Sequence, residues 1–247
     1  RRGRGGGLHR EKRKNTREQV AGANINYRKG RFQAGVSGVY QAYDRVYNPV
    51  RREYNRYSLR DSTNVNASVD YSYQLPGFII AGETALAKSG AVATLNLVQY
   101  RPRSNLSFSL LHRSFPITYT AWKAQAFSEG KNVQNEHGLY LGTDFQPFAR
   151  FSVATYIDLV RFPWLKYGVD NPSTALDAYL LGTYSFTRRN FMEVRCKFKR
   201  KEKNTTHPES AARVVAPYSI SARQAYCERE WHIIANKSLR GEANQML

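Results

Sequence analysis

The chain has 247 residues, of which 41% are hydrophobic and 13% aromatic, and tyrosine (17) outnumbers phenylalanine (12). This length suits one large all-β domain or two small ones. Because no run approaches the roughly 18 apolar residues of a membrane-spanning helix, a helical membrane protein is excluded. The net charge of +19, from 38 basic and 19 acidic residues, suits nucleic acid, an anionic membrane surface or an anion-conducting pore.

Residues 1–17 are predicted to be a basic, flexible tail. Its cations are interleaved with glycines: Arg1, Arg2, Arg4, Arg10, Lys12, Arg13, Lys14 and Arg17. Such an arm could contact the phosphates of nucleic acid or of anionic lipid. A purely solvated tail is the favoured alternative, because no base-stacking aromatic residue lies between the cations. No apolar stretch follows them as in a signal peptide, so a mature form or a fragment is expected.

From Asn64 onwards the residues alternate strictly between apolar and polar, as in a strand whose two faces meet different surroundings. Segments of about ten residues with this period recur along the chain, the length of a strand that crosses a bilayer at a tilt. The predicted strands, in chain order, are 19–27, 32–42, 64–75, 78–87, 91–100, 106–115, 138–146, 151–161, 176–186 and 191–199. Two weaker candidates follow, at 214–227 and 231–239.

The connections alternate between tight turns, such as LPG and TRRN, and mostly longer polar or aromatic stretches. The short Lys88-Ser89-Gly90 connection is the exception. Short turns on one side and longer loops on the other are typical of outer-membrane barrels. The sequence therefore predicts an all-β fold, an antiparallel up-and-down transmembrane β-barrel of about 10–12 strands. Its domain is predicted at residues 18–240, weakest after 203, with a C-terminal tail at 241–247.

In such a barrel the polar wall faces the lumen and the apolar wall faces lipid. The predicted lumen-facing residues are Asn66, Asp70, Glu83, Arg113, Asp144, Asp158, Glu193, Arg195 and Lys197. These charges would either set the ion preference of a pore or brace a small filled barrel, and both alternatives stay open. Aromatic residues near segment ends are predicted to lie at the membrane interface: Tyr71, Tyr73, Phe78, Phe162, Trp164 and Tyr167. A protein-binding loop is the alternative for the last three.

Three stretches, NEHGLYLGTDFQPFARFSVATYIDLVRFPWLKYGVDNPS (Asn135 to Ser173), ANINYRKGRFQAGVSGVY (Ala23 to Tyr40) and the 64–87 hairpin, carry a resemblance to a known family. They resemble the barrel of a bacterial outer-membrane family whose members carry a helix-hairpin-helix segment upstream, over about residues 18–203. The resemblance implies a barrel in the outer membrane of a Gram-negative cell. The helix-hairpin-helix segment is absent, and the C-terminal RGEANQML lacks an aromatic-terminated last strand. We therefore expect a fragment, whose barrel is incomplete.

No catalytic, cofactor-binding or metal-binding residue is predicted. His112 follows the apolar wall of its segment, whereas Asp144 lies on the polar wall. These two residues and His137 are therefore not expected to converge on a catalytic site. No serine has a nucleophile motif, and Cys196 and Cys227 give neither a disulfide framework nor zinc-ligand spacing.

The predicted function is a non-enzymatic outer-membrane protein, either a pore for solutes or a structural protein. Its predicted partner is outer-membrane lipid, and no small-molecule substrate is identifiable. The alternative is a soluble, basic, all-β protein that binds nucleic acid. An apolar band on the outside of the sheet would favour the membrane, whereas a packed interior with an external basic groove would favour nucleic acid.

Overall fold

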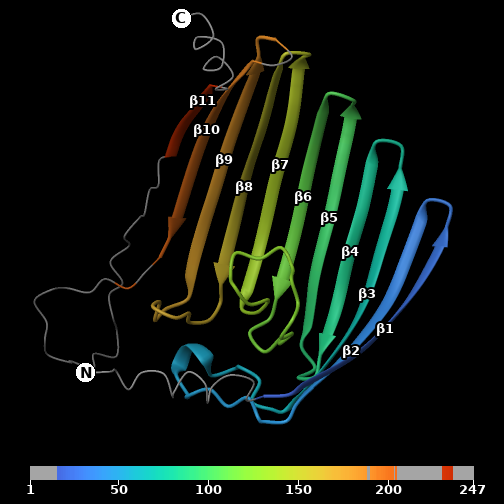
Figure 1. The fold of residues 1–247 in the computed structure, drawn as a ribbon, viewed down its shortest axis with the longest axis vertical. Coiled ribbons are helices and arrows are strands. Elements are labelled where there is room, and N and C mark those ends of the chain that lie inside the picture. Colours follow the sequence, from blue (N-terminus) through green and yellow to red (C-terminus); the bar gives the residue numbers. More distant parts are fainter. Residues whose placement is uncertain (1–15, 188–189, 203, 205–229, 236–247) are drawn as a thin grey trace, which may run out of the picture.

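The structure, a computed structural model, describes residues 16–187, 190–202, 204 and, as backbone, 230–235. These residues form one antiparallel sheet of eleven strands, in which each strand pairs with its neighbour in the chain (Figure 1). The strands are β1 (Glu18–Lys29), β2 (Phe32–Tyr43), β3 (Thr63–Leu75), β4 (Phe78–Ala87), β5 (Val92–Arg103), β6 (Leu106–Phe115), β7 (Glu136–Phe148), β8 (Phe151–Phe162), β9 (Ser173–Ser185), β10 (Phe191–Lys201) and β11 (Glu230–Ala235).

The predicted all-β, up-and-down antiparallel fold is confirmed. Each of the ten predicted segments forms a strand, and the observed ends differ from the predicted ends by a few residues. The weak candidate at 231–239 corresponds to β11, whereas the candidate at 214–227 lies outside the described residues, as do the tail at 241–247 and almost all of the basic tail. Tight turns at Gly30 and Gly77 use positive φ angles of 58° and 77°, which glycine adopts without a steric penalty.

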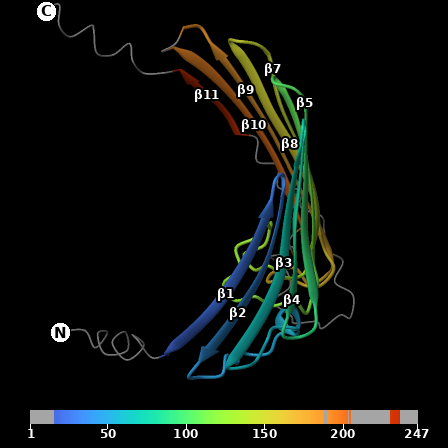
Figure 2. The ribbon, with the colours of Figure 1, turned by 90° about the vertical axis from the view of Figure 1, so that its right-hand side faces the viewer.

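The sheet is strongly curved, with a concave and a convex face (Figure 2). The tight hairpin turns gather at one end of the strands, here called the turn end, and the longer connections at the other, the loop end (Figure 1). Among the described strands the sheet is open, since β1 pairs with β2 alone and β11 with β10 alone.

The convex face is apolar and uncovered by any other described element. Val65, Val69 and Leu141, for example, are 44%, 51% and 48% exposed. Paired residues of neighbouring strands lie on the same face, so the registers extend this apolar face from β1 to β10. The alternation of the sequence thus produces one continuous apolar band on the outside of the curve.

The buried residues lie on the concave face instead, towards the loop end. One cluster joins Ala87 and Ala93 of β4 and β5 with Phe115, Tyr119 and Val133, and a second joins Val160, Phe162 and Ala175. The one helical element in the described part of the chain is a short 3-10 turn, η1 (Glu53–Asn55), in the β2–β3 connection. None of the described helical residues forms a helix of the length and apolarity that a membrane crossing requires.

Candidate functional site

The connection between β6 and β7, residues 116–135, does not extend away from the sheet but folds over its concave face (Figures 1 and 2). We call this segment the inward loop. Its Tyr119 and Val133 pack on small residues of β4 and β5 in the buried cluster. The Thr120 carbonyl oxygen accepts hydrogen bonds from the Asn66 and Asn64 amides of β3, at 3.0 and 3.3 Å. The loop therefore lies against strands far from its own two.

Ion pairs hold the inward loop at both sides of the sheet. Lys123 donates to the Glu18 carboxylate of β1 at 2.7 Å, across 105 positions of sequence. On the other side, the Glu129 carboxylate accepts a hydrogen bond from Lys199 of β10 at 3.1 Å and forms an ion pair with Lys201. The loop thus bridges strands near the two edges of the sheet.

A buried charge cluster fixes the base of the loop to the wall. The Arg113 side chain is fully buried, and its guanidinium donates to Glu136 at 2.6 Å and to both oxygens of Asp158 at 2.9 Å. The Glu136 carboxylate also accepts hydrogen bonds from the backbone N–H groups of Glu129 and Gly130, at 2.9–3.1 Å. A guanidinium fork with two carboxylates satisfies the charge that burial would otherwise leave uncompensated.

Gly138 of β7 makes room for this cluster. A Cβ atom at this position would lie 2.4 Å from Cζ of Arg113 and 2.6 Å from its Nε. The guanidinium cannot withdraw easily, because the Glu136 and Asp158 carboxylates hold it in place. Glycine is therefore required here by the close approach of a charged side chain, while its backbone still pairs in the sheet.

Glu129 is the titratable group of the inward loop whose pKa shift bears on its attachment. Burial of its carboxylate raises the pKa, but hydrogen bonds from Lys201 and Lys199 outweigh burial and lower the pKa below its ordinary value of 4.5. The carboxylate is thus held in its charged form, which is the form that attracts the two lysines.

Charged side chains lie along several strands of the concave face. Asp70 and Glu83 lie directly opposite each other on β3 and β4, and neither forms an ion pair with any described residue. Arg195, Lys197 and Lys199 line β10 on the same face. A row of three tyrosine rings crosses β7, β8 and β9 between them: Tyr140, Tyr156 and Tyr179, with ring centroids 5.3 and 5.4 Å apart. Arg195 pairs with Glu193, and Lys199 pairs with Asp177 at 2.8 Å, so the face carries unpaired carboxylates on β3 and β4 and mostly paired charges on β9 and β10.

All nine residues predicted to face the lumen lie on this concave face, as the registers show. The structure brings Arg113 together with Asp158, and Glu193 together with Arg195. It places Asp70 opposite Glu83, and neither carboxylate forms an ion pair with any described residue. Asp144 instead accepts a hydrogen bond from Ser107 at 3.2 Å.

The six predicted interface aromatics divide into two groups. Tyr73 and Phe78 are exposed on the convex face near the turn end, with Tyr71 beside them donating its hydroxyl to Asn96 at 3.0 Å. Phe162 is instead 3% exposed, in the buried cluster of the concave face, so the prediction that it reaches the membrane interface is wrong. It occupies an inward position of β8, opposite Ser173.

Trp164 and Tyr167 lie within the layer of loops at the loop end. The Trp164 indole packs edge-to-face on Tyr57 and donates its N–H to the Glu53 carbonyl oxygen at 3.0 Å. Tyr167 contacts Tyr54 in the same way, but is 85% exposed. These contacts join the β8–β9 loop to the β2–β3 loop.

The sequence reasoning missed the inward loop itself, and with it Glu129, Glu136 and Lys201. One signal was available for Glu136, since it continues the polar-wall alternation of Gly138, Tyr140 and Gly142 by one step. No comparable signal pairs Glu129 with β10, because that contact depends on the path of the loop through space.

One serine–histidine pair forms at the loop end of the convex face. Ser114 Oγ lies 2.9 Å from Nδ1 of His137, which is exposed. No carboxylate of the described residues contacts the imidazole, so the orienting third group of a hydrolytic triad is missing from that part of the chain. As predicted, His112 and Asp144 lie on opposite faces. Within the described residues no three His, Cys, Asp or Glu side chains are grouped to hold a metal ion.

No protein-family model and no curated protein matches the chain. Two solved structures resemble the fold. The FrpB iron transporter from Neisseria meningitidis (F3-3 variant) is 12% identical with a TM-score of 0.43, over 78% of this chain and 37% of the transporter, so this chain spans little more than a third of that protein. The NanC porin, in its rhombohedral crystal form, is 12% identical with a TM-score of 0.32, over 74% of this chain and 81% of the porin.

Proposed function

We propose that this chain forms the wall of an outer-membrane β-barrel that passes small polar solutes or ions, without enzymatic activity, and that the inward loop narrows the passage. The observation that carries the proposal is the pairing of an uncovered apolar convex face with a charged concave face. In a membrane barrel these are the lipid-facing and lumen-facing surfaces, respectively.

The apolar band supports contact between the convex face and membrane lipid. Contiguous exposed apolar patches larger than a few hundred Å² are rare on monomeric soluble proteins and mark membrane or protein contacts. The alternative of a soluble nucleic-acid-binding protein calls for the apolar wall to be an interior core. The described residues instead bury their clusters on the polar side, beneath the inward loop. The apolar band therefore favours lipid over nucleic acid.

The concave face supports a polar passage. Charged side chains along the wall of a pore select among charged solutes, and the inward loop reduces the open cross-section beside them. Because unpaired backbone groups are not tolerated in hydrocarbon, the proposal requires both the β1 and the β11 edge to be paired in the membrane.

The membrane part is tested by two matched substitutions in the middle of β3. Val69→Lys places a charge on the convex face, and Ser68→Lys places the same charge on the concave face. We expect Val69→Lys to destabilise the barrel in lipid vesicles by about 2–4 kcal/mol, the effect of a lysine at the bilayer midplane. Ser68→Lys should cost little. Equal effects, or a wild-type protein that fractionates as soluble and shows no mobility shift on boiling, would contradict the assignment of faces.

The passage is tested by single-channel conductance in planar bilayers. Deletion of residues 121–130 removes both Lys123 and Glu129 and so detaches the inward loop from both sides of the sheet. We expect a larger conductance than that of the wild type, whereas Lys88→Met at an exposed ion pair of the rim should leave it unchanged. An inserted, heat-modifiable barrel without conductance in either form would assign a structural role instead.

A further inference from the structure

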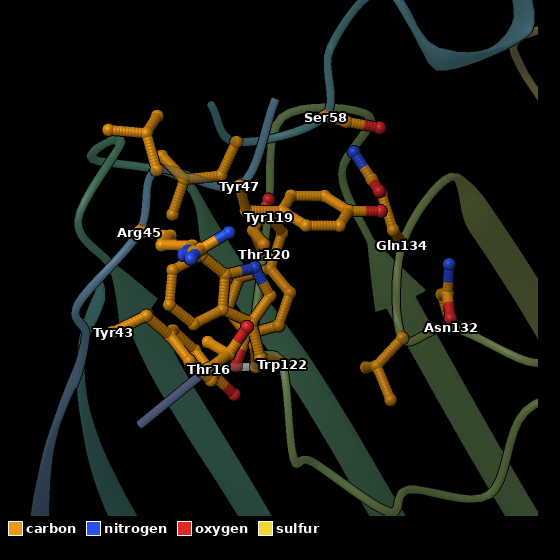
Figure 3. A pocket seen from close by; sticks show the side chains of 14 residues that line it. Thr16, Tyr43, Arg45, Tyr47, Ser58, Tyr119, Thr120, Trp122, Asn132 and Gln134 are labelled. Carbon is orange, nitrogen blue, oxygen red and sulfur yellow. The ribbon is translucent and has the colours of Figure 1, made fainter. Parts of the chain in front are cut away.

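Two hollows lie side by side at the loop end, between the inward loop and the neighbouring loops. The larger, of about 540 Å³, opens between the inward loop and the β2–β3 loop (Figure 3). The smaller, of about 340 Å³, opens between the inward loop and the β8–β9 loop. Both are lined by Ser58, Asn132 and Gln134, so these three polar residues form a wall common to the two hollows. Together the hollows make an elongated groove rather than a single round pocket.

Aromatic side chains line both halves of this groove. In the larger hollow Trp122 packs edge-to-face against Tyr43, with ring centroids 5.1 Å apart, and lies 6.4 Å from Tyr47. In the smaller one Trp164 packs on Tyr57 at 5.0 Å. Edge-to-face packing and the indole hydrogen bond to η1 fix these rings in place before any ligand arrives. The groove thus offers two preformed aromatic platforms in a row.

Polar side chains line the larger hollow beside the aromatic rings. Tyr119 borders this hollow, and Asn132 and Gln134 belong to the wall that the two hollows share. Asn132 is exposed, and its side-chain amide forms no hydrogen bond with any described residue. A ligand with several hydroxyl groups can form hydrogen bonds with these groups.

The charged residues that line the groove are all cations. Its lining includes Arg45, Lys131 and Lys166 and contains no aspartate or glutamate. Arg45 and Lys131 are exposed and form no ion pair with any described residue, and Lys166 lies over the Phe162 ring at 3.2 Å. An occupant that carries carboxylate or phosphate groups would therefore meet cations only.

We propose that this groove binds an acidic carbohydrate chain. The apolar CH face of a sugar ring stacks on tryptophan and tyrosine, its hydroxyls pair with the amides and the Tyr119 hydroxyl, and its acidic groups pair with Arg45 and Lys131. Two successive platforms suit a chain of linked rings better than a single small molecule. Such a chain could be a free acidic oligosaccharide or the sugar part of lipopolysaccharide. The inference uses the loop-end geometry alone and does not depend on conductance through the barrel.

The test is a binding titration of the purified chain in detergent, in which binding is measured by isothermal calorimetry and by tryptophan fluorescence. The probes are a galacturonic acid hexamer, a neutral maltohexaose of equal length, and lipopolysaccharide freed of lipid A. We expect the acidic hexamer to bind at least about tenfold more tightly than maltohexaose. Preferential binding of the lipopolysaccharide fragment would support the same site with a lipid-linked source.

Three variants decide whether binding occurs in the groove. Trp122→Ala should weaken acidic-sugar binding about tenfold or more, while Tyr100→Ala, an aromatic residue of the convex face, should leave it unchanged. Arg45→Gln, at an exposed residue without an ion-pair partner among the described residues, should fold normally and reduce the preference for the acidic over the neutral sugar. Absence of binding by all three probes, or binding that neither Trp122→Ala nor Arg45→Gln changes, would overturn the proposal.

Discussion

Removal of the buried cation at the base of the inward loop tests the charge cluster directly. Arg113→Met keeps an unbranched stem and much of the volume of the side chain but leaves the Glu136 and Asp158 carboxylates, 0% and 8% exposed as side chains, without their guanidinium partner. Breaking a buried pair on one side costs about 3–5 kcal/mol, because the remaining charge stays desolvated. We therefore expect a loss of this size in the free energy of unfolding. It corresponds to a fall of roughly two to three and a half orders of magnitude in the folding equilibrium constant.

The assay is urea unfolding of the refolded protein in detergent micelles, followed by tryptophan fluorescence. Lys88→Met is the matched control, since it removes a lysine from an ion pair with Asp61 in which both side chains are 36% exposed. Exposed pairs contribute about 0–1 kcal/mol. If Arg113→Met costs no more than Lys88→Met, the cluster is not desolvated in solution and the argument from burial fails.

Three further predictions concern the same end of the sheet. Gly138→Ala should destabilise the protein by at least about 1 kcal/mol in the same urea assay, because its Cβ would collide with the Arg113 guanidinium. Acidification below pH 4.5 should release the inward loop, since a carboxylate with a lowered pKa contributes stability that is present above its ordinary pKa and lost as the pH falls through the folded value. The fluorescence of Trp122, which lies in this loop, should report the release, and Glu129→Gln should weaken its dependence on pH. Lys166, whose pKa burial and Lys201 lower to about 8, should be acetylated before other lysines at pH 8, as peptide mapping would detect.

The strands were predictable because their signal is local. Alternation with a period of two fixes which residues share a face, and the tight turns fix the register of the hairpins, so Val65 and Asp70 could be placed on opposite faces without coordinates. The strand ends were less predictable, because pairing continues beyond the predicted segments, to Glu136 at the start of β7 and Lys201 at the end of β10.

The path of the inward loop could not be predicted, because its ion pairs with the strands join residues 70 to 105 positions apart. Phe162 shows the same limit within one motif. An aromatic residue at a strand end is a good candidate for a membrane interface. Phe162, however, lies on the inward side of β8 and is covered by the loops, so it is a core residue. A sequence pattern gives the face of a residue, whereas the cover over that face is decided by distant parts of the chain.

The attachment of the inward loop to both β1 and β10 implies an order of events in folding. The hairpins require contacts between neighbours in sequence, which close early. The loop can find Glu18 and Lys199 together only after ten strands have paired and curved, because those two residues belong to strands near opposite edges. Docking of the loop is thus a late step, and it reports that the sheet has reached its native curvature. The Trp122 ring, packed on Tyr43 of β2, is one of three tryptophans, and its surroundings change at that step, later than hairpin formation.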